Sequence, residues 1–91
     1  MCVPVVQVLN IGAIGCPMYQ LKGPKMAKRD YAPNFPLKHA QKDMRLALEM
    51  GAELGLPLPT TAAANEEFVK ALDEHGDEDF SAVYEQSTKK A

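Results

Sequence analysis

Apolar residues recur every three or four positions between Phe35 and Gly55, in the longest helical pattern of the chain. This spacing places one narrow apolar stripe on one side of a helix. The stripe consists of Leu37, Ala40, Met44, Ala47/Leu48, Gly51 and Leu54. We therefore expect one long helix over about residues 36–54, with Pro36 as its first residue and Gly55 as a left-handed stop.

Four polar or aromatic residues share a region off that stripe. His39, Lys42 and Asp43 follow Phe35 by four, seven and eight positions, a spacing that brings side chains to one side of a helix. This group is the candidate site. A surface lysine paired with Asp43 or Glu49 is the plain alternative for Lys42.

Two further helices are predicted after the long one. The first runs from about Thr60 to His75 and ends at Gly76, with Ala64, Phe68, Ala71 and Leu72 expected inside. Asp79 is typical of the N-cap of a last helix, because its carboxylate can accept hydrogen bonds from the first free amides. The C-terminal part of the chain is therefore read as helical throughout.

The first third of the chain is more broken. Residues Val3 to Leu9 are consistent with the end of a buried helix, and Pro17 with the start of a short one. Gly23 and Pro24 are expected to stop that helix, because proline removes a backbone donor and clashes with the preceding turn. An irregular connection with one helical turn is expected over residues 23–33.

The fold class that follows is all-α, since no stretch alternates with period two. The 91 residues, 46% of them hydrophobic, predict one small globular domain over residues 1–91. No apolar run approaches a membrane span, so no membrane partner is expected. The sequence has no glycine-rich phosphate loop and no cluster with metal-ligand spacing, so no metal site is expected.

Charge divides the chain more than its net value of −2 suggests. Residues 22–45 hold seven basic against two acidic residues, whereas residues 46–91 hold ten acidic against three basic ones. The basic part suits a carboxylate substrate or a phosphorylated ligand, with a solvated surface as the alternative. Nucleic acid is not expected as a partner, because the acidic part would repel phosphates.

Four sequence motifs carry a family resemblance. In order they are GAIGCPMYQLKGPKM (12–26), FPLKHAQKDMRLA (35–47), AAANEEF (62–68) and DEDFSAVY (77–84). Together they resemble the C-terminal domain of the β-hydroxyacid dehydrogenase family, in particular its glyoxylate and succinic semialdehyde reductase branch. The resemblance implies a C-terminal helical domain of the 6-phosphogluconate dehydrogenase-like type. It also implies NADP or NAD as cofactor and small aldehyde acids as substrates.

The resemblance also implies roles for single residues. Lys42 matches the family lysine that contacts the nicotinamide cofactor, while Phe35 and Asp43 match positions that line the active-site cleft. His39 has no family role. No residue of this stretch matches the catalytic lysine, and the Rossmann domain with its G-x-G-x-x-G motif is absent from the 91 residues.

Whether the chain is an enzyme therefore stays open at this point. We expect a partial C-terminal domain that is inactive alone, whether as a truncated product, a gene model without its first exons or a separate fragment. The alternative is a non-enzymatic oligomerisation module, similar to the chromatin-associated member of the family. In either case we expect self-association as a homodimer or tetramer, and a cytoplasmic protein, or an organellar one if the true N-terminus is missing.

Overall fold

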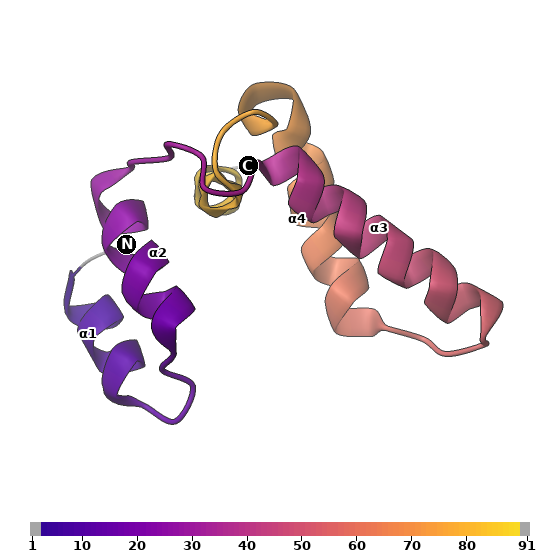
Figure 1. Ribbon diagram of the computed structural model, residues 1–91, viewed down its shortest axis with the longest axis horizontal. Helices are drawn as coiled ribbons and strands as arrows, with labels where there is room; N and C mark the ends of the chain where they lie inside the picture. The colour runs from indigo at the N-terminus through magenta and orange to yellow at the C-terminus, as the bar shows by residue number, and fades with distance from the viewer. Residues whose placement is uncertain (1–2, 90–91) are drawn as a thin grey trace. The chain divides into compact units, whose positions relative to one another are not determined.

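The chain forms two compact helical units, one ending at Tyr31 and the other beginning at Ala32 (Figure 1). A computed structural model describes residues 3–89, and over that range the ordered elements are all helices. The predicted all-α class is therefore confirmed. Within the same range no helix combines the length and apolar content that a bilayer crossing requires. A single domain over residues 1–91 stays a prediction.

The first unit is a pair of packed helices, α1 (Val3–Ile11) and α2 (Pro17–Lys28). Proline is the first residue of α2, as predicted, where its missing N–H costs no hydrogen bond. Val6 is the buried residue of α1. A Cβ atom on Gly23 would lie 2.6 Å from Cγ1 of Val6, so glycine at this position allows the two helices to approach.

The predicted stop at Gly23 and Pro24 is wrong, because α2 continues through both residues to Lys28. Pro24 removes one backbone donor from the helix, but the close contact of Gly23 with Val6 favours the helical path. Packing between helices thus outweighs the local preference of the dipeptide. The helix ends instead at Arg29, whose backbone has the left-handed φ of 55°.

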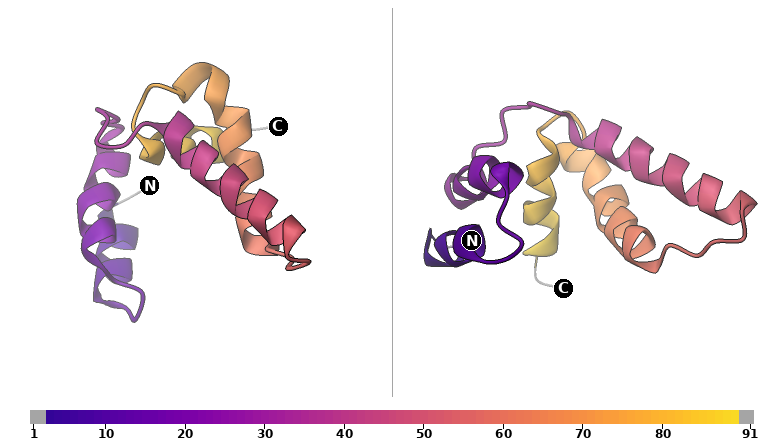
Figure 2. Two further views of the ribbon diagram at one scale, coloured as in Figure 1. Left: turned by 45° about the vertical axis from the view of Figure 1, so that its right-hand side comes forward. Right: turned by 60° about the horizontal axis from the view of Figure 1, so that its bottom comes forward.

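The second unit is built on two long helices that lie side by side, α3 (Leu37–Glu53) and α4 (Pro59–His75) (Figure 2). The prediction of one long helix over about residues 36–54 is confirmed. Pro36 precedes the helix as its N-cap rather than forming its first turn. Gly55 has the expected left-handed backbone, with a φ of 68°, and starts the loop to α4.

The core of the second unit lies along the contact of α3 with α4. Leu37 is fully buried at the start of α3, Gly51 is buried near its end, and Ala71 is buried on α4. Three predicted core positions are wrong, since Ala47 on α3, Leu54 and Ala64 are exposed. Leu54 is 72% exposed, because it lies just past the end of α3 where the chain turns into the loop, and Ala64 lies on the outer side of α4.

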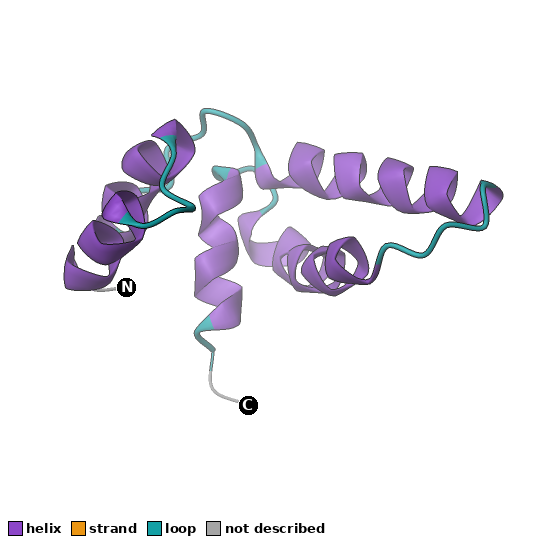
Figure 3. Ribbon diagram, turned by 90° about the horizontal axis from the view of Figure 1, so that it is seen from below, coloured by secondary structure: helices purple, strands orange, loops and turns teal. Residues whose placement is uncertain are grey.

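The last predicted helix is split in two. A 3₁₀ helix, η1 (Phe80–Ala82), leads into the short α5 (Val83–Ser87), which packs beside α4 (Figures 2 and 3). Asp79 is the N-cap of η1, and its side chain accepts a hydrogen bond from the N–H of Ser81. The predicted capping role of Asp79 is therefore confirmed.

Candidate functional site

The N-terminal end of α3 is held by the segment that follows α4. Pro36 offers no side-chain cap to the helix. Instead, the N–H of Leu37 donates to the carbonyl of Glu78 at 2.8 Å, and the N–H of Lys38 donates to the carbonyl of Gly76 at 3.0 Å. These bonds satisfy amides that a helix otherwise leaves unpaired at its start.

This arrangement determines how the site can bind an anion. The next two N–H groups of α3, those of His39 and Ala40, donate to the carbonyl of Pro36 at 3.0 and 3.3 Å. A helix N-terminus binds phosphate or carboxylate through free backbone N–H groups. In the first turn of α3 these N–H groups already donate to carbonyl oxygens of the chain. Any anion at this end of α3 must therefore be bound by side chains.

The backbone around Phe35 is fixed from both sides. Pro36 and Asp79 form an isolated antiparallel bridge, and the N–H of Phe80 donates to the carbonyl of Phe35 at 2.9 Å. Oδ1 of Asp79 accepts from the N–H groups of Asn34 and Phe35 at 2.9 and 3.2 Å. Phe35 therefore has little freedom to move relative to η1.

Two rings flank that of Phe35. The Phe80 ring meets it edge to face with centroids 6.4 Å apart, and the His39 ring lies tilted with centroids 6.0 Å apart. Both separations fall in the range of favourable aromatic pairs. Phe35 is still 41% exposed, so its ring is accessible to a planar ligand. His39, one of the four residues of the predicted site, lies against the Phe35 ring.

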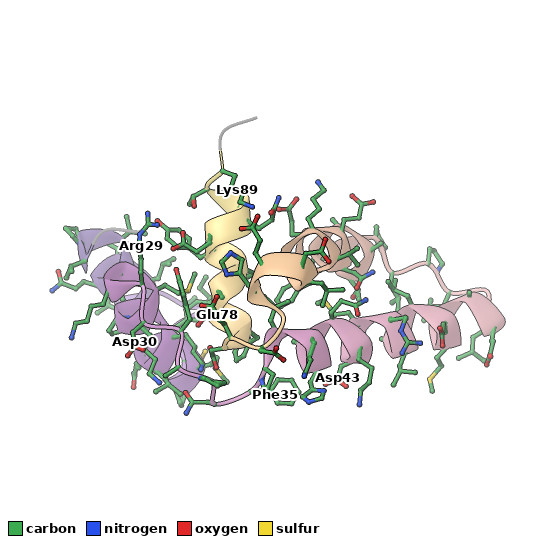
Figure 4. All side chains as sticks on the ribbon, turned by 90° about the horizontal axis from the view of Figure 1, so that it is seen from above. Arg29, Asp30, Phe35, Asp43, Glu78 and Lys89 are labelled. Carbon is green, nitrogen blue, oxygen red and sulfur yellow. The ribbon has the colours of Figure 1, made fainter. Side chains whose placement is uncertain are left out.

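Lys42 and Asp43 are exposed residues of α3. Figure 4 shows Phe35 and Asp43 on the side of α3 that faces away from α4. Within the described part of the chain, neither the Lys42 nor the Asp43 side chain forms an ion pair or hydrogen bond. Glu49, the alternative partner of Lys42, instead lies 3.1 Å from Arg45. The ammonium group of Lys42 is thus available to a ligand.

The other lysine at this end of α3 is already engaged. Nζ of Lys38 donates to Oδ1 of Asp77 at 2.7 Å. This hydrogen bond, and next the positive charge of Lys38, lower the pKa of the Asp77 carboxyl below its usual value. Lys42, seven positions after Phe35, therefore remains as a lysine of α3 that has no acidic partner among residues 3–89.

Sequence reasoning missed the contributions of Asp79 and Phe80 to this region. It assigned Asp79 only to the helix that follows it, whereas the structure links Asp79 to residues 44 and 45 positions earlier. A carboxylate before a short helix indicates a cap, but no local sequence signal indicates that the same carboxylate also accepts hydrogen bonds from Asn34 and Phe35. The role of the Phe35, Lys42 and Asp43 side chains stays a prediction.

Other parts of the second unit offer less to a charged ligand. A hollow of about 300 Å³ lies between the ends of α3 and α4 that the loop joins, and its lining is apolar, with Leu48, Leu56 and Leu58 among its residues. Among residues 3–89 there is no group of three metal-ligating side chains. The start of α3 is therefore the region whose chemistry suits a cofactor or a carboxylate.

The sequence matches a known protein family over most of its length. Residues 3–86 match the family described as NAD-binding of NADP-dependent 3-hydroxyisobutyrate dehydrogenase. The chain belongs to this family. The predicted resemblance to hydroxyacid dehydrogenases is thereby confirmed. Use of NAD or NADP is a property of the family, and Lys42 and Phe35 lie within the matched residues.

Two relatives represent the two branches that the motifs suggest. Glyoxylate/succinic semialdehyde reductase 1 of Arabidopsis thaliana is 54% identical over 82 residues, which are 89% of this chain and 28% of the reductase. Cytokine-like nuclear factor N-PAC of Aedes aegypti is 42% identical over 82 residues, which are 88% of this chain and 14% of the relative.

A solved structure has a similar fold. The 3-hydroxyisobutyrate dehydrogenase of Salmonella typhimurium aligns with a TM-score of 0.83 and 26% identity, over 90% of this chain and 29% of its own. The fold is consistent with the helical C-terminal part of such a dehydrogenase. The chain thus spans less than a third of the length of each of these proteins.

Proposed function

We propose that the start of α3 forms one wall of the cofactor and substrate cleft of an oxidoreductase that reduces small aldehyde acids, such as glyoxylate or succinic semialdehyde, with NADPH. The observation that carries this proposal is the exposed Lys42, without an acidic partner among residues 3–89, two turns from the held ring of Phe35. The names of the Arabidopsis relative support the substrate class.

Each of the three residues has its own part in this proposal. The Lys42 ammonium binds a cofactor oxygen through a charge-assisted hydrogen bond. The Phe35 ring packs against a planar group of the cofactor or the substrate, and the Asp43 carboxylate shapes the polar edge of the pocket. NADPH, when bound, supplies the hydride.

The whole activity is proposed for the complete enzyme. Reduction of a carbonyl requires the cofactor to be held against it and a proton donor to be in place. The chain spans 28% of the Arabidopsis reductase, so we expect no turnover from the 91 residues alone. Turnover of glyoxylate or succinic semialdehyde by the purified chain would contradict this expectation.

Binding of NADP⁺ to the chain tests the proposal directly. We expect titration with NADP⁺ to shift the NMR signals of the Phe35 and Lys42 amides. Lys42→Met should weaken this binding at least about tenfold, since a hydrogen bond to a charged group contributes about 1.5–3 kcal/mol. Lys70→Met is the matched control, because Lys70 is an exposed lysine on α4. Equal binding by wild type and Lys42→Met, or none by wild type, would refute the proposal.

A second candidate function is self-association without catalysis, as a homodimer or tetramer. The observation in its favour is a row of exposed apolar side chains on α3, Leu46, Met50 and, just past the helix, Leu54. We commit to a second copy of this chain as the partner. On the same helix Arg45 precedes Glu53, so two copies in antiparallel pairing bring opposite charges together.

The two functions are compatible. NADP⁺ binding is expected if the chain has the first function, and is not expected if it has only the second. An interaction module requires the exposed apolar residues of α3, but its function does not depend on the ammonium group of Lys42. The name of the N-PAC relative, a nuclear factor, supports a function without catalysis. The proposed compartment is the cytoplasm, with an organelle as the alternative.

A further inference from the structure

Asp79 is a fully buried carboxylate with an unusually complete set of donors. Oδ1 accepts the N–H groups of Asn34 and Phe35 at 2.9 and 3.2 Å. Oδ2 accepts the N–H and the hydroxyl of Ser81 at 3.1 and 2.6 Å. An ionised carboxylate offers about four acceptor positions, so these four bonds account for them. Burial of the carboxylate is tolerated for this reason.

The two oxygens of Asp79 serve different parts of the chain. The Oδ2 bonds cap η1 and need nothing outside that helix. The Oδ1 bonds reach back to residues 34 and 35, and they are not needed to cap α3. Its first amides, on Leu37 and Lys38, already donate to the carbonyls of Glu78 and Gly76. What the Oδ1 bonds determine is the path of the backbone that carries the Phe35 ring.

We propose that Asp79 is a positioning residue, which fixes the Phe35 ring in the cleft wall through the backbone of residues 34 and 35. Ser81 holds the Asp79 side chain in the orientation this requires, with the shortest bond of the set. The inference rests on the proposed function of Phe35. It makes the wall a product of two segments, the start of α3 and the residues just before η1.

Asp79→Asn is the sharpest test, because the amide keeps the volume but cannot accept at both ends. We expect amide hydrogen exchange at Asn34 and Phe35 to become about tenfold faster, with loss of a hydrogen bond to a charged acceptor. The nuclear Overhauser contacts between the Phe35 and Phe80 rings should weaken. The affinity for NADP⁺ should fall several-fold.

Asp77→Asn is the matched control. It removes the same charge two residues earlier, from an exposed side chain that contacts Lys38 and not the backbone of Phe35. We expect Asp77→Asn to leave exchange at residues 34 and 35, and NADP⁺ affinity, as in wild type. An amide within α4, such as that of Val69, should keep its protection in both variants.

Specific outcomes overturn the inference. Wild-type exchange at residues 34 and 35 in Asp79→Asn would do so, as would an equal loss of protection in α4, which indicates a general structural role. If Asp79→Asn does not fold, Ser81→Ala decides: we expect a smaller increase confined to residues 34 and 35, and no increase would refute the proposal. If wild type does not bind NADP⁺, the proposed function fails, while the exchange data still decide whether Asp79 positions Phe35.

Discussion

The ammonium group of Lys38 lies 2.7 Å from the carboxylate of Asp77 and ties the first turn of α3 to the loop that follows α4. The backbone of Lys38 meets the same loop, since its N–H donates to the carbonyl of Gly76. Both groups of the ion pair are exposed to solvent, so salt should screen their attraction. The pair therefore adds little to the total stability of the unit.

That contact predicts a pH effect of known sign. The hydrogen bond from Lys38, and then its charge, hold the pKa of Asp77 below the ordinary value of 3.8. A carboxyl whose pKa is lowered by folding contributes stability that is present above its unfolded pKa. This contribution is lost as the pH falls through the folded pKa. Carboxyl carbon NMR of Lys38→Met should show the Asp77 pKa raised toward 3.8, with Lys70→Met unchanged.

Leu37 is the largest apolar side chain with no exposed surface, so its truncation should be costly. We expect Leu37→Ala to lower the free energy of unfolding by about 2–5 kcal/mol, the range seen for buried leucines. Urea unfolding followed by circular dichroism measures this change. Leu46→Ala, at an exposed position of the same helix, is the control and should cost much less. Equal losses would mean that the core does not lie where α3 meets α4.

Gly51 is predicted to resist substitution because the loop folds back on it. A Cβ there would lie 2.8 Å from the carbonyl oxygen of Leu56, a backbone atom that cannot move aside cheaply. The N–H of Leu56 also donates to the carbonyl of Gly51 at 2.8 Å. Gly51→Ala should therefore lower the free energy of unfolding by about 1–3 kcal/mol, in spite of the higher helix propensity of alanine.

Gly55 provides the comparison for that variant. A Cβ at Gly55 would have open space, but its φ of 68° strains most other residues. Gly55→Asn should be tolerated better than Gly55→Ala in thermal unfolding, because asparagine adopts the left-handed region more readily. A neutral Gly51→Ala would contradict the first expectation, and a Gly55→Ala variant as stable as Gly55→Asn would contradict the second.

The long helix was predictable because its signals are local. The apolar spacing, Pro36 at the start and Gly55 at the end all act within a few residues of where they stand. The predicted helix end at Gly23 and Pro24 also rested on a local signal, but α2 continues through both residues because Gly23 packs against Val6. A sequence pattern does not report the partner that a helix will meet.

The candidate site shows the same division. Phe35 and Asp43 share one side of α3, as their spacing indicates. The link from Asp79 back to Phe35 spans 44 positions, and nothing in either segment specifies the other. Likewise, the sequence offered Glu49 as a partner for Lys42, whereas Glu49 pairs with Arg45 on the same helix. The Arg45–Glu49 pair is a local contact, four positions apart, whereas Lys38 is engaged by Asp77, which lies 39 positions later in the chain.

The exposed row on α3 predicts self-association that one charge should disrupt. Met50 is 63% exposed and lies one turn from both Leu46 and Leu54, so Met50→Glu places a charge at the centre of the row. We expect wild type to form dimers or tetramers in light scattering coupled to size exclusion, and Met50→Glu to dissociate them. Val69→Glu, an equivalent change at an exposed position of α4, should leave them intact. A wild type that stays monomeric at every concentration would refute the prediction.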